Sequence, residues 1–204
     1  MKRLRWVSVF FLGPLLFGCA TGGTFPLSLH YEPTKASPSL QQKLGPKVAF
    51  APFTDERSDT FYVGRYDPAQ GMPRYFKSEP APLGTAVMEL LNEALLKKGL
   101  KTMSVPSWDG TPESLKNMGA DSIFLVHIKK FWVEGKDDLL LRTSIQASVR
   151  LVIQLGVKAE EKVFTRNVDV EREKTVFGGG PDHLKQMINE ILTDIFDGVL
   201  SNPY

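Results

Sequence analysis

Apolar and polar residues alternate most regularly between Arg142 and Ile153. A period of two places successive side chains on opposite faces of a β-strand, so this segment predicts a strand with one buried and one solvated face. Residues 122–134 before it and residues 164–170 after it also read as strands. Together the three segments predict a meander of long antiparallel strands. The residues expected on the buried face of the central strand are Thr143, Ile145, Ala147, Val149, Leu151 and Ile153.

Two other segments carry apolar residues at helical spacing, residues 83–95 and residues 184–199. Pro82 precedes the first and Gly99 follows it, which are typical start and stop signals of a helix. Two amphipathic helices need an apolar surface to cover, and the sheet offers one. The pattern predicts an α+β fold, with a mainly antiparallel sheet covered on one face by two helices.

A compact apolar strand at residues 47–53 marks where folded structure is expected to begin. The full chain has 204 residues, of which 42% are hydrophobic and 24% charged. This is an ordinary globular balance with enough apolar residues for one modest core. Residues 47–204 are therefore predicted to form a single α+β domain.

Residues 54–82 show no sustained period, yet they concentrate tyrosines and arginines. Loops of this length without structure of their own are uncommon and are often functional. Exposed Tyr and Arg form binding hot spots, whereas buried ones would simply cap the edge of the sheet. The sequence leaves both interpretations open. For the binding interpretation a partner protein is expected, with lipid or peptidoglycan as alternatives. The residues of this candidate partner-binding loop are Arg57, Tyr62, Arg65, Tyr66, Arg74 and Tyr75.

The chain begins with the basic segment Met1–Arg5 and continues with the apolar run Trp6–Phe17. This is the pattern of a secretory signal peptide, and the run is shorter than the roughly 20 residues that a membrane-spanning helix needs. The run ends in Leu16-Phe17-Gly18-Cys19, which resembles the lipobox of bacterial lipoproteins. Cys19 is the only cysteine of the chain.

The lipobox resemblance implies cleavage between Gly18 and Cys19, after which Cys19 carries a diacylglyceryl group and an acyl chain. Several acyl chains make a lasting anchor, because each buried CH₂ contributes about 0.8 kcal/mol. Residues 19–46 are then expected to be a flexible tether, in which residues 27–31 can add a short edge strand. Ala20 differs from the Asp that resembles an inner-membrane retention signal, so the expected location is the outer membrane, facing the periplasm.

Removal of residues 1–18 also changes the charge of the protein. The precursor has a formal charge of +2, and cleavage removes three basic residues and no acidic one, which leaves −1. The basic pI of the precursor therefore gives no reason to expect nucleic-acid binding. With one cysteine, the mature chain has no intramolecular disulfide.

The order of the elements also resembles the YajG-type family of small envelope lipoproteins. The features that carry this resemblance are the lipobox, a first strand leading into Phe53–Arg57, a helix ending at Lys97–Leu100, a strand opening at Asp121 and a closing amphipathic helix. The resemblance implies a non-catalytic interaction or scaffold protein with a partner protein in the envelope. The alternative is an auxiliary lipoprotein subunit of an ABC-type lipid or solute transport system, which would need an apolar groove between sheet and helix.

Catalytic signals are weak along the whole chain. His30, His127 and His183 lie far apart, and none has a partner at the spacing of metal ligands. Gly178–Gly180 precedes a helix, but no Gly-Lys-Ser/Thr pattern follows it. We expect no enzymatic activity, no metal and no cofactor beyond the acyl groups on Cys19.

Overall fold

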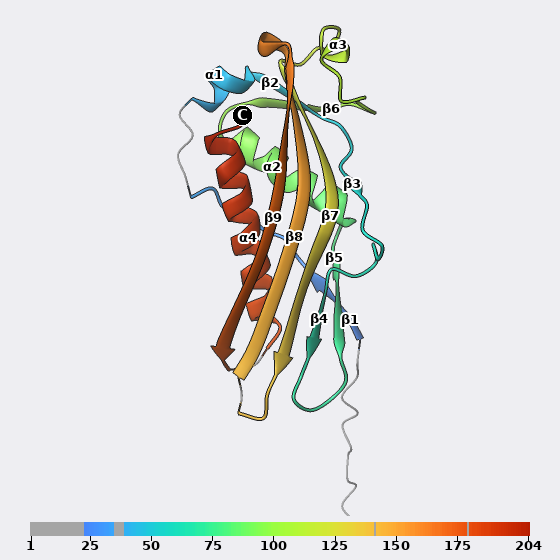
Figure 1. The fold of residues 1–204 in the computed structure, drawn as a ribbon, viewed down its shortest axis with the longest axis vertical. Coiled ribbons are helices and arrows are strands. Elements are labelled where there is room, and N and C mark those ends of the chain that lie inside the picture. The colour runs from blue at the N-terminus through green and yellow to red at the C-terminus, as the bar shows by residue number, and fades with distance from the viewer. Residues whose placement is uncertain (1–22, 35–38, 141, 179) are drawn as a thin grey trace, which may run out of the picture.

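The computed structural model describes residues 23–34, 39–140, 142–178 and 180–204. These residues form one nine-stranded sheet and four α-helices, so the predicted α+β class is confirmed (Figure 1). Three strands of 16 residues each run the length of the molecule and pair antiparallel in chain order. They are β7 (Ser122–Asp137), β8 (Arg142–Val157) and β9 (Lys162–Phe177).

The other edge of β7 pairs with three short strands in succession. These strands are β2 (Lys47–Phe50), β3 (Thr54–Asp55) and β4 (Gly64–Asp67), and all three run parallel to β7. The strand β6 (Lys101–Ser104) pairs parallel with β2, because a helix carries the chain back across the sheet between them. The sheet is therefore mixed, and the prediction of a mainly antiparallel sheet is wrong.

The segment predicted to be a long loop supplies strands to the sheet. β4 and β5 (Arg74–Ser78) form an antiparallel pair, and β1 (Gly23–Leu27) adds to β5 in parallel. A Cβ on Gly64 would lie 2.4 Å from the backbone oxygen of Val133, so glycine lets β4 approach β7 closely enough to pair. Because β1 belongs to the sheet, folded structure begins before residue 47, within the expected tether.

Two helices cover one face of the long strands (Figure 1). They are α2 (Leu83–Lys97) and α4 (Asp182–Ser201), and each buries an apolar stripe against the sheet. The ring of Phe196 on α4 is fully buried, as are Phe124 and Phe131 on β7. The sheet–helix layer therefore holds the main core of the molecule. Two shorter helices, α1 (Leu40–Leu44) and α3 (Pro112–Leu115), lie near the end of the molecule where β7 begins.

The segment after β1 is fastened to α4 through Asp197, which is 2% exposed. The hydroxyl of Tyr31 donates to Asp197 Oδ1 at 2.9 Å, and the backbone N–H of Thr34 donates to Oδ2 at 3.0 Å. The Tyr31 ring also meets Phe196 edge-on at 5.3 Å between ring centroids. Burial and the neighbouring Asp197 carboxylate raise the pKa of Tyr31 well above its usual range. Part of the predicted tether is thus docked on the domain.

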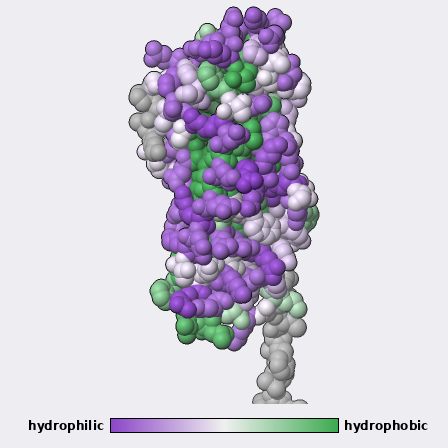
Figure 2. All heavy atoms as spheres, viewed as in Figure 1, coloured by the Kyte–Doolittle hydropathy of each residue, from purple (hydrophilic) through white to green (hydrophobic). Residues whose placement is uncertain are grey.

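The face of β7, β8 and β9 opposite α2 and α4 is here called the open face. None of the helices that the structure describes covers most of its length (Figure 1). A small second cluster of buried apolar residues covers only the end near α3, where Trp108 and Leu115 pack against Ile123. Figure 2 shows that most of this face is hydrophilic. The same three strands thus present one closed apolar face and one polar face that remains accessible.

Candidate interaction surface

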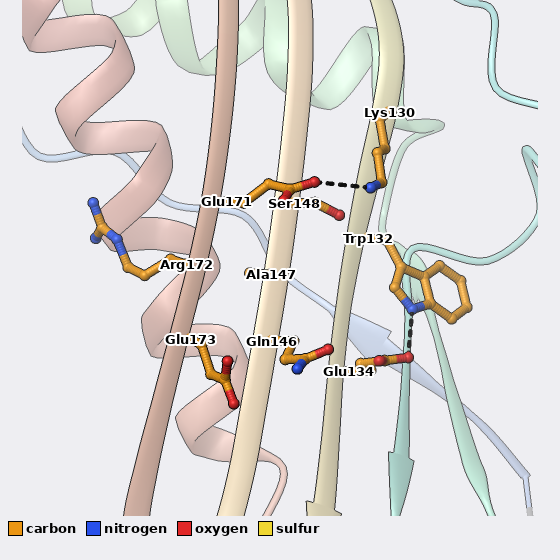
Figure 3. Close-up of a pocket in the computed structure, with 9 residues that line it drawn as sticks. All are labelled: Lys130, Trp132, Glu134, Gln146, Ala147, Ser148, Glu171, Arg172 and Glu173. Atoms are coloured by element: carbon orange, nitrogen blue, oxygen red, sulfur yellow. Dashed lines mark hydrogen bonds and ion pairs between the residues drawn. The ribbon is translucent and has the colours of Figure 1, made fainter.

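The open face contains a hollow of about 400 Å³ over the middle of the three long strands (Figure 3). The register explains its composition, because Trp132 on β7 lies beside Ser148 on β8, which lies beside Glu171 on β9. The adjacent row on this face runs from Glu134 through Gln146 to Glu173. The lining residues are Lys130, Trp132, Glu134, Gln146, Ala147, Ser148, Glu171, Arg172 and Glu173.

Two contacts order the side chains of this hollow (Figure 3). Lys130 Nζ reaches across β8 to Glu171 Oε1 at 3.3 Å, and the indole N–H of Trp132 donates to Glu134 Oε2 at 3.2 Å. The lining therefore combines an aromatic ring, a cation and several acceptors. Such a surface suits hydrogen bonding and ring packing with a partner.

Five of the six residues of the predicted partner-binding loop separate into two groups, and Arg74 belongs to neither. Arg57 and Tyr66 serve the protein's own structure. The Arg57 side chain is 6% exposed, pairs with Asp55 at 2.8 Å and donates to the backbone oxygens of Tyr62 and Phe131 at 2.7 and 3.1 Å. Tyr66 is buried, and its hydroxyl donates to Asp137. Burial, followed by the contact with Asp137, raises the pKa of Tyr66 to about 12.

The second group forms a half-buried cluster next to the hollow. The rings of Tyr62 and Tyr75 lie 4.8 Å apart between centroids, and the Arg65 guanidinium lies 5.7 Å from the Tyr75 ring centroid. Arg65 also donates to Asp67 at 2.8 Å, and this contact raises the pKa of Arg65. Arg65 pairs in register with Glu134, which lines the hollow. The cluster of Tyr62, Arg65 and Tyr75 therefore continues the polar hollow across β4.

Arg74 lies apart from this cluster. In β5 it alternates with Tyr75, so its side chain belongs to the opposite face of the sheet. There its guanidinium lies 5.6 Å from the ring centroid of Phe25 on β1. Arg74 thus helps to seat β1 on the sheet edge.

Lys130, Trp132 and Glu134 were not predicted as binding residues from the sequence. The sequence signal was nevertheless present, because Gln146 and Ser148 occupy the polar positions of the alternating strand. Residues of β7 and β9 that pair with Gln146 and Ser148 place their side chains on the same face, and they complete the lining of the hollow. Only the register identifies those partners.

The three histidines lie in separate parts of the structure. His127 Nδ1 lies 2.6 Å from Glu56 Oε1, His30 Nε2 lies 3.1 Å from Glu32 Oε1, and His183 Nε2 lies 3.1 Å from the backbone oxygen of Gly178. Glu56 also contacts Lys129, which is the largest cause of its lowered pKa. Within the described ranges, no group of three or more His, Cys, Asp or Glu side chains is placed to hold a metal ion.

The predicted cleavage and lipidation residues, Gly18 and Cys19, lie outside the described residues, which begin at Gly23. Among the helices that the structure does describe, none has the length and apolar character required to span a bilayer.

No family model matches the chain, and no curated protein matches its sequence. The fold is similar to that of protein XCC0632 from Xanthomonas campestris, described by the DUF330 family model, with a TM-score of 0.56 and 12% identity over 87% of this chain and 92% of that one. An uncharacterised protein matches with a TM-score of 0.51 and 12% identity, over 90% of this chain and 99% of that one. Lipoprotein GNA1162 from Neisseria meningitidis reaches a TM-score of only 0.38, with 10% identity over 73% of this chain and 96% of that one. The similarity to XCC0632 and to the uncharacterised protein shows a shared fold.

Proposed function

We propose that this protein is a lipoprotein of the bacterial envelope that acts without catalysis as an interaction or scaffold protein. In this proposal Cys19 carries the lipid anchor, and the open face binds an envelope protein. The outer membrane, with the domain facing the periplasm, is the proposed location.

The observation that carries the binding role is the contrast between the two faces of the long strands. One face is sealed by α2 and α4, whereas the other exposes a hollow with an aromatic ring and charged side chains. Trp, Tyr and Arg are the residue types that dominate the energetics of protein interfaces. Trp132 on β7, Arg65 on β4 and Tyr75 on β5 lie on the same side of the sheet, and each remains partly exposed.

The packing between sheet and helices favours the interaction role over the transporter-subunit alternative. That alternative needs an apolar groove between the sheet and a helix. In the described interface, Leu95 of α2 and Ile188 and Phe196 of α4 are 0% exposed, as is Ile128 of β7. These side chains fill the space that an apolar ligand would need.

The anchor is tested by the Cys19→Ser variant. We expect the wild-type protein to fractionate with membranes and its mature N-terminus to carry acyl chains in mass spectrometry. The serine variant lacks the thiol, so we expect loss of the lipid mass and of membrane association. Membrane fractionation of an unlipidated, uncleaved Cys19→Ser protein contradicts the anchor.

The partner surface is tested by photo-crosslinking in intact cells, with a photoreactive residue at Ser148 in the hollow. The matched control carries it at Glu190, an exposed residue on the outer side of α4. We expect a discrete crosslinked protein from position 148, and its loss when Arg65 and Tyr75 are both changed to Ala. Equal products from the two positions, or none from position 148, contradict the proposed surface.

A further inference from the structure

One end of the molecule displays large apolar side chains in contact with solvent. Leu139 and Leu140, in the connection between β7 and β8, are 82% and 69% exposed, and Phe177 at the end of β9 is 81% exposed. Because β8 pairs antiparallel with both β7 and β9, the connection from β7 to β8 and the end of β9 lie at the same end of the sheet. Figure 2 shows the apolar atoms gathered at the lower end of the molecule. We call Leu139, Leu140 and Phe177 the apolar tip.

The turn that carries the two leucines is held by its own hydrogen bonds. Asp138 Oδ1 accepts from the backbone N–H of Leu140 at 2.8 Å and from that of Arg142 at 2.9 Å. Asp138 Oδ2 accepts from Arg142 Nε at 2.8 Å. The contacts with Arg142 and Leu140 lower the pKa of Asp138. These bonds hold Leu140 and Arg142 to Asp138, and they leave Leu139 and Leu140 exposed in a connection where soluble proteins normally place polar residues.

The apolar tip lies at the end of the sheet where the described chain begins. β4 runs parallel to β7, so the connection from β4 to β5 lies beside the end of β7, and Gly23 pairs with Arg74 directly after that connection (Figure 1). Only three residues lie between Cys19 and Gly23, so the two positions are four residue steps apart in the sequence. At about 3.6 Å per residue, a chain of that length spans at most about 14 Å. A lipid anchor on Cys19 therefore keeps this end of the domain beside the bilayer.

We propose that the apolar tip inserts into the interfacial region of the same bilayer that holds the acylated Cys19. This inference rests on the proposed lipid anchor. Apolar side chains that enter the headgroup and acyl boundary leave water without crossing the membrane. Exposed Lys136 and Lys174, close to the tip on β7 and β9, then face the phosphate groups of the lipids. The anchor and the tip fix the orientation of the domain, with the long strands pointing away from the membrane.

A bilayer fits the geometry of the apolar tip better than a second copy of the chain. The tip is a projecting turn and a strand end, whereas a dimer needs two complementary surfaces of substantial area. Because β1 is paired with β5 from Gly23 onward, only the short chain before Gly23 lets the domain move away from the anchor.

The test uses the full-length lipidated protein with one introduced cysteine, Leu139→Cys, labelled with an environment-sensitive fluorophore. Because Cys19 is the only native cysteine and its sulfur carries the lipid, the introduced thiol is the only one free to react. The protein is reconstituted in vesicles of phosphatidylethanolamine and phosphatidylglycerol. The matched control is Glu160→Cys, in the exposed turn at the opposite end of the long strands.

We expect the label at position 139 to shift its emission to the blue and to lose quenching by an aqueous ion when the protein is in vesicles. The label at position 160 is expected to keep both its emission and its quenching. Phe177→Cys provides a second position that is expected to behave like position 139. Equal quenching at positions 139, 177 and 160 in vesicle-bound protein overturns the insertion. A blue shift at position 139 that persists in detergent without vesicles, together with a doubled mass in solution, identifies a second copy instead and also overturns it.

The same experiment separates failure of the insertion from failure of the anchor. If the unmodified parent protein takes up the thiol label and leaves the vesicles, Cys19 is not lipidated and the anchor fails. If the parent stays in the vesicles unlabelled while the tip remains exposed to water, the anchor holds and the insertion alone is overturned.

Discussion

The two faces of β7 and β8 are formed by alternating residues of the same strands, yet their compositions are opposite. On the covered face, Val126, Ile128, Val149 and Leu151 are 0% exposed and pack under α2 and α4. On the open face, the intervening positions carry charged, amide and hydroxyl side chains around Trp132. The covered face therefore holds most of the folding free energy, and the open face is free to carry recognition.

The largest expected effect is on the covered face. Phe196→Ala removes a fully buried ring between α4 and the sheet, and we expect a loss of about 3–5 kcal/mol in the free energy of unfolding, because the packed surroundings leave a cavity. Denaturant unfolding measures this loss. Trp132→Ala removes a larger but partly exposed ring on the open face, and it is expected to cost clearly less. Equal losses from the two variants would show that the open face contributes as much to stability as the covered face.

An intermediate effect is expected at the buried carboxylate that holds the segment after β1. The two oxygens of Asp197 accept from the Tyr31 hydroxyl and from the Thr34 N–H, whereas the side chain of asparagine has only one acceptor oxygen. We therefore expect Asp197→Asn to lower the free energy of unfolding by about 1–3 kcal/mol. Hydrogen exchange of residues 28–34 is expected to quicken in this variant. The control is Asp194→Asn on the same helix, whose partner contact with Arg172 is exposed and whose loss is expected to be small.

The buried phenol of Tyr66 predicts a smaller effect that depends on pH. Its folded pKa is raised to about 12, above the ordinary value near 10, so the folded state prefers the neutral phenol. This contribution is fully present below the unfolded pKa and is lost as the pH rises from about 10 to 12. The unfolding free energy is therefore expected to fall across that range. Tyr66→Phe is expected to flatten part of the fall, and an unchanged slope contradicts this assignment.

The smallest effect is expected for an ion pair on the open face. Arg150 and Asp169 lie 2.7 Å apart with both side chains half exposed. Exposed pairs of this kind contribute about 0–1 kcal/mol, so Arg150→Ala is expected to change the unfolding free energy by no more than that. Chemical denaturation at low and high salt measures it. A loss as large as that of Phe196→Ala would show that the open face also carries stability.

The elements with long, regular patterns were predictable from the sequence. The helices α2 and α4 follow the apolar spacing of residues 83–95 and 184–199. Such patterns come from local geometry, because one buried face repeats every 3.6 residues along a helix.

The parallel edge of the sheet was not predictable in the same way. β3 has two residues and β4 has four, which is too short to show a period. Their position depends on pairing with β7, whose free edge is long enough for three short strands. This pairing joins parts of the chain that lie far apart in the sequence. For the same reason, the sequence did not show which residues of the predicted partner-binding loop are accessible. Only the pairing of β4 with β5 and β7 shows that Tyr66 is buried and that Arg65 is accessible.

The length of the three long strands has a consequence for where a partner can be met. A strand of 16 residues, rising about 3.3 Å per residue, spans about 50 Å. If one end rests on a lipid surface, the turn at Lys158–Glu160 and the neighbouring α3 stand about 50 Å above it. The rigid strands would then hold the hollow of the open face at a constant distance from the membrane.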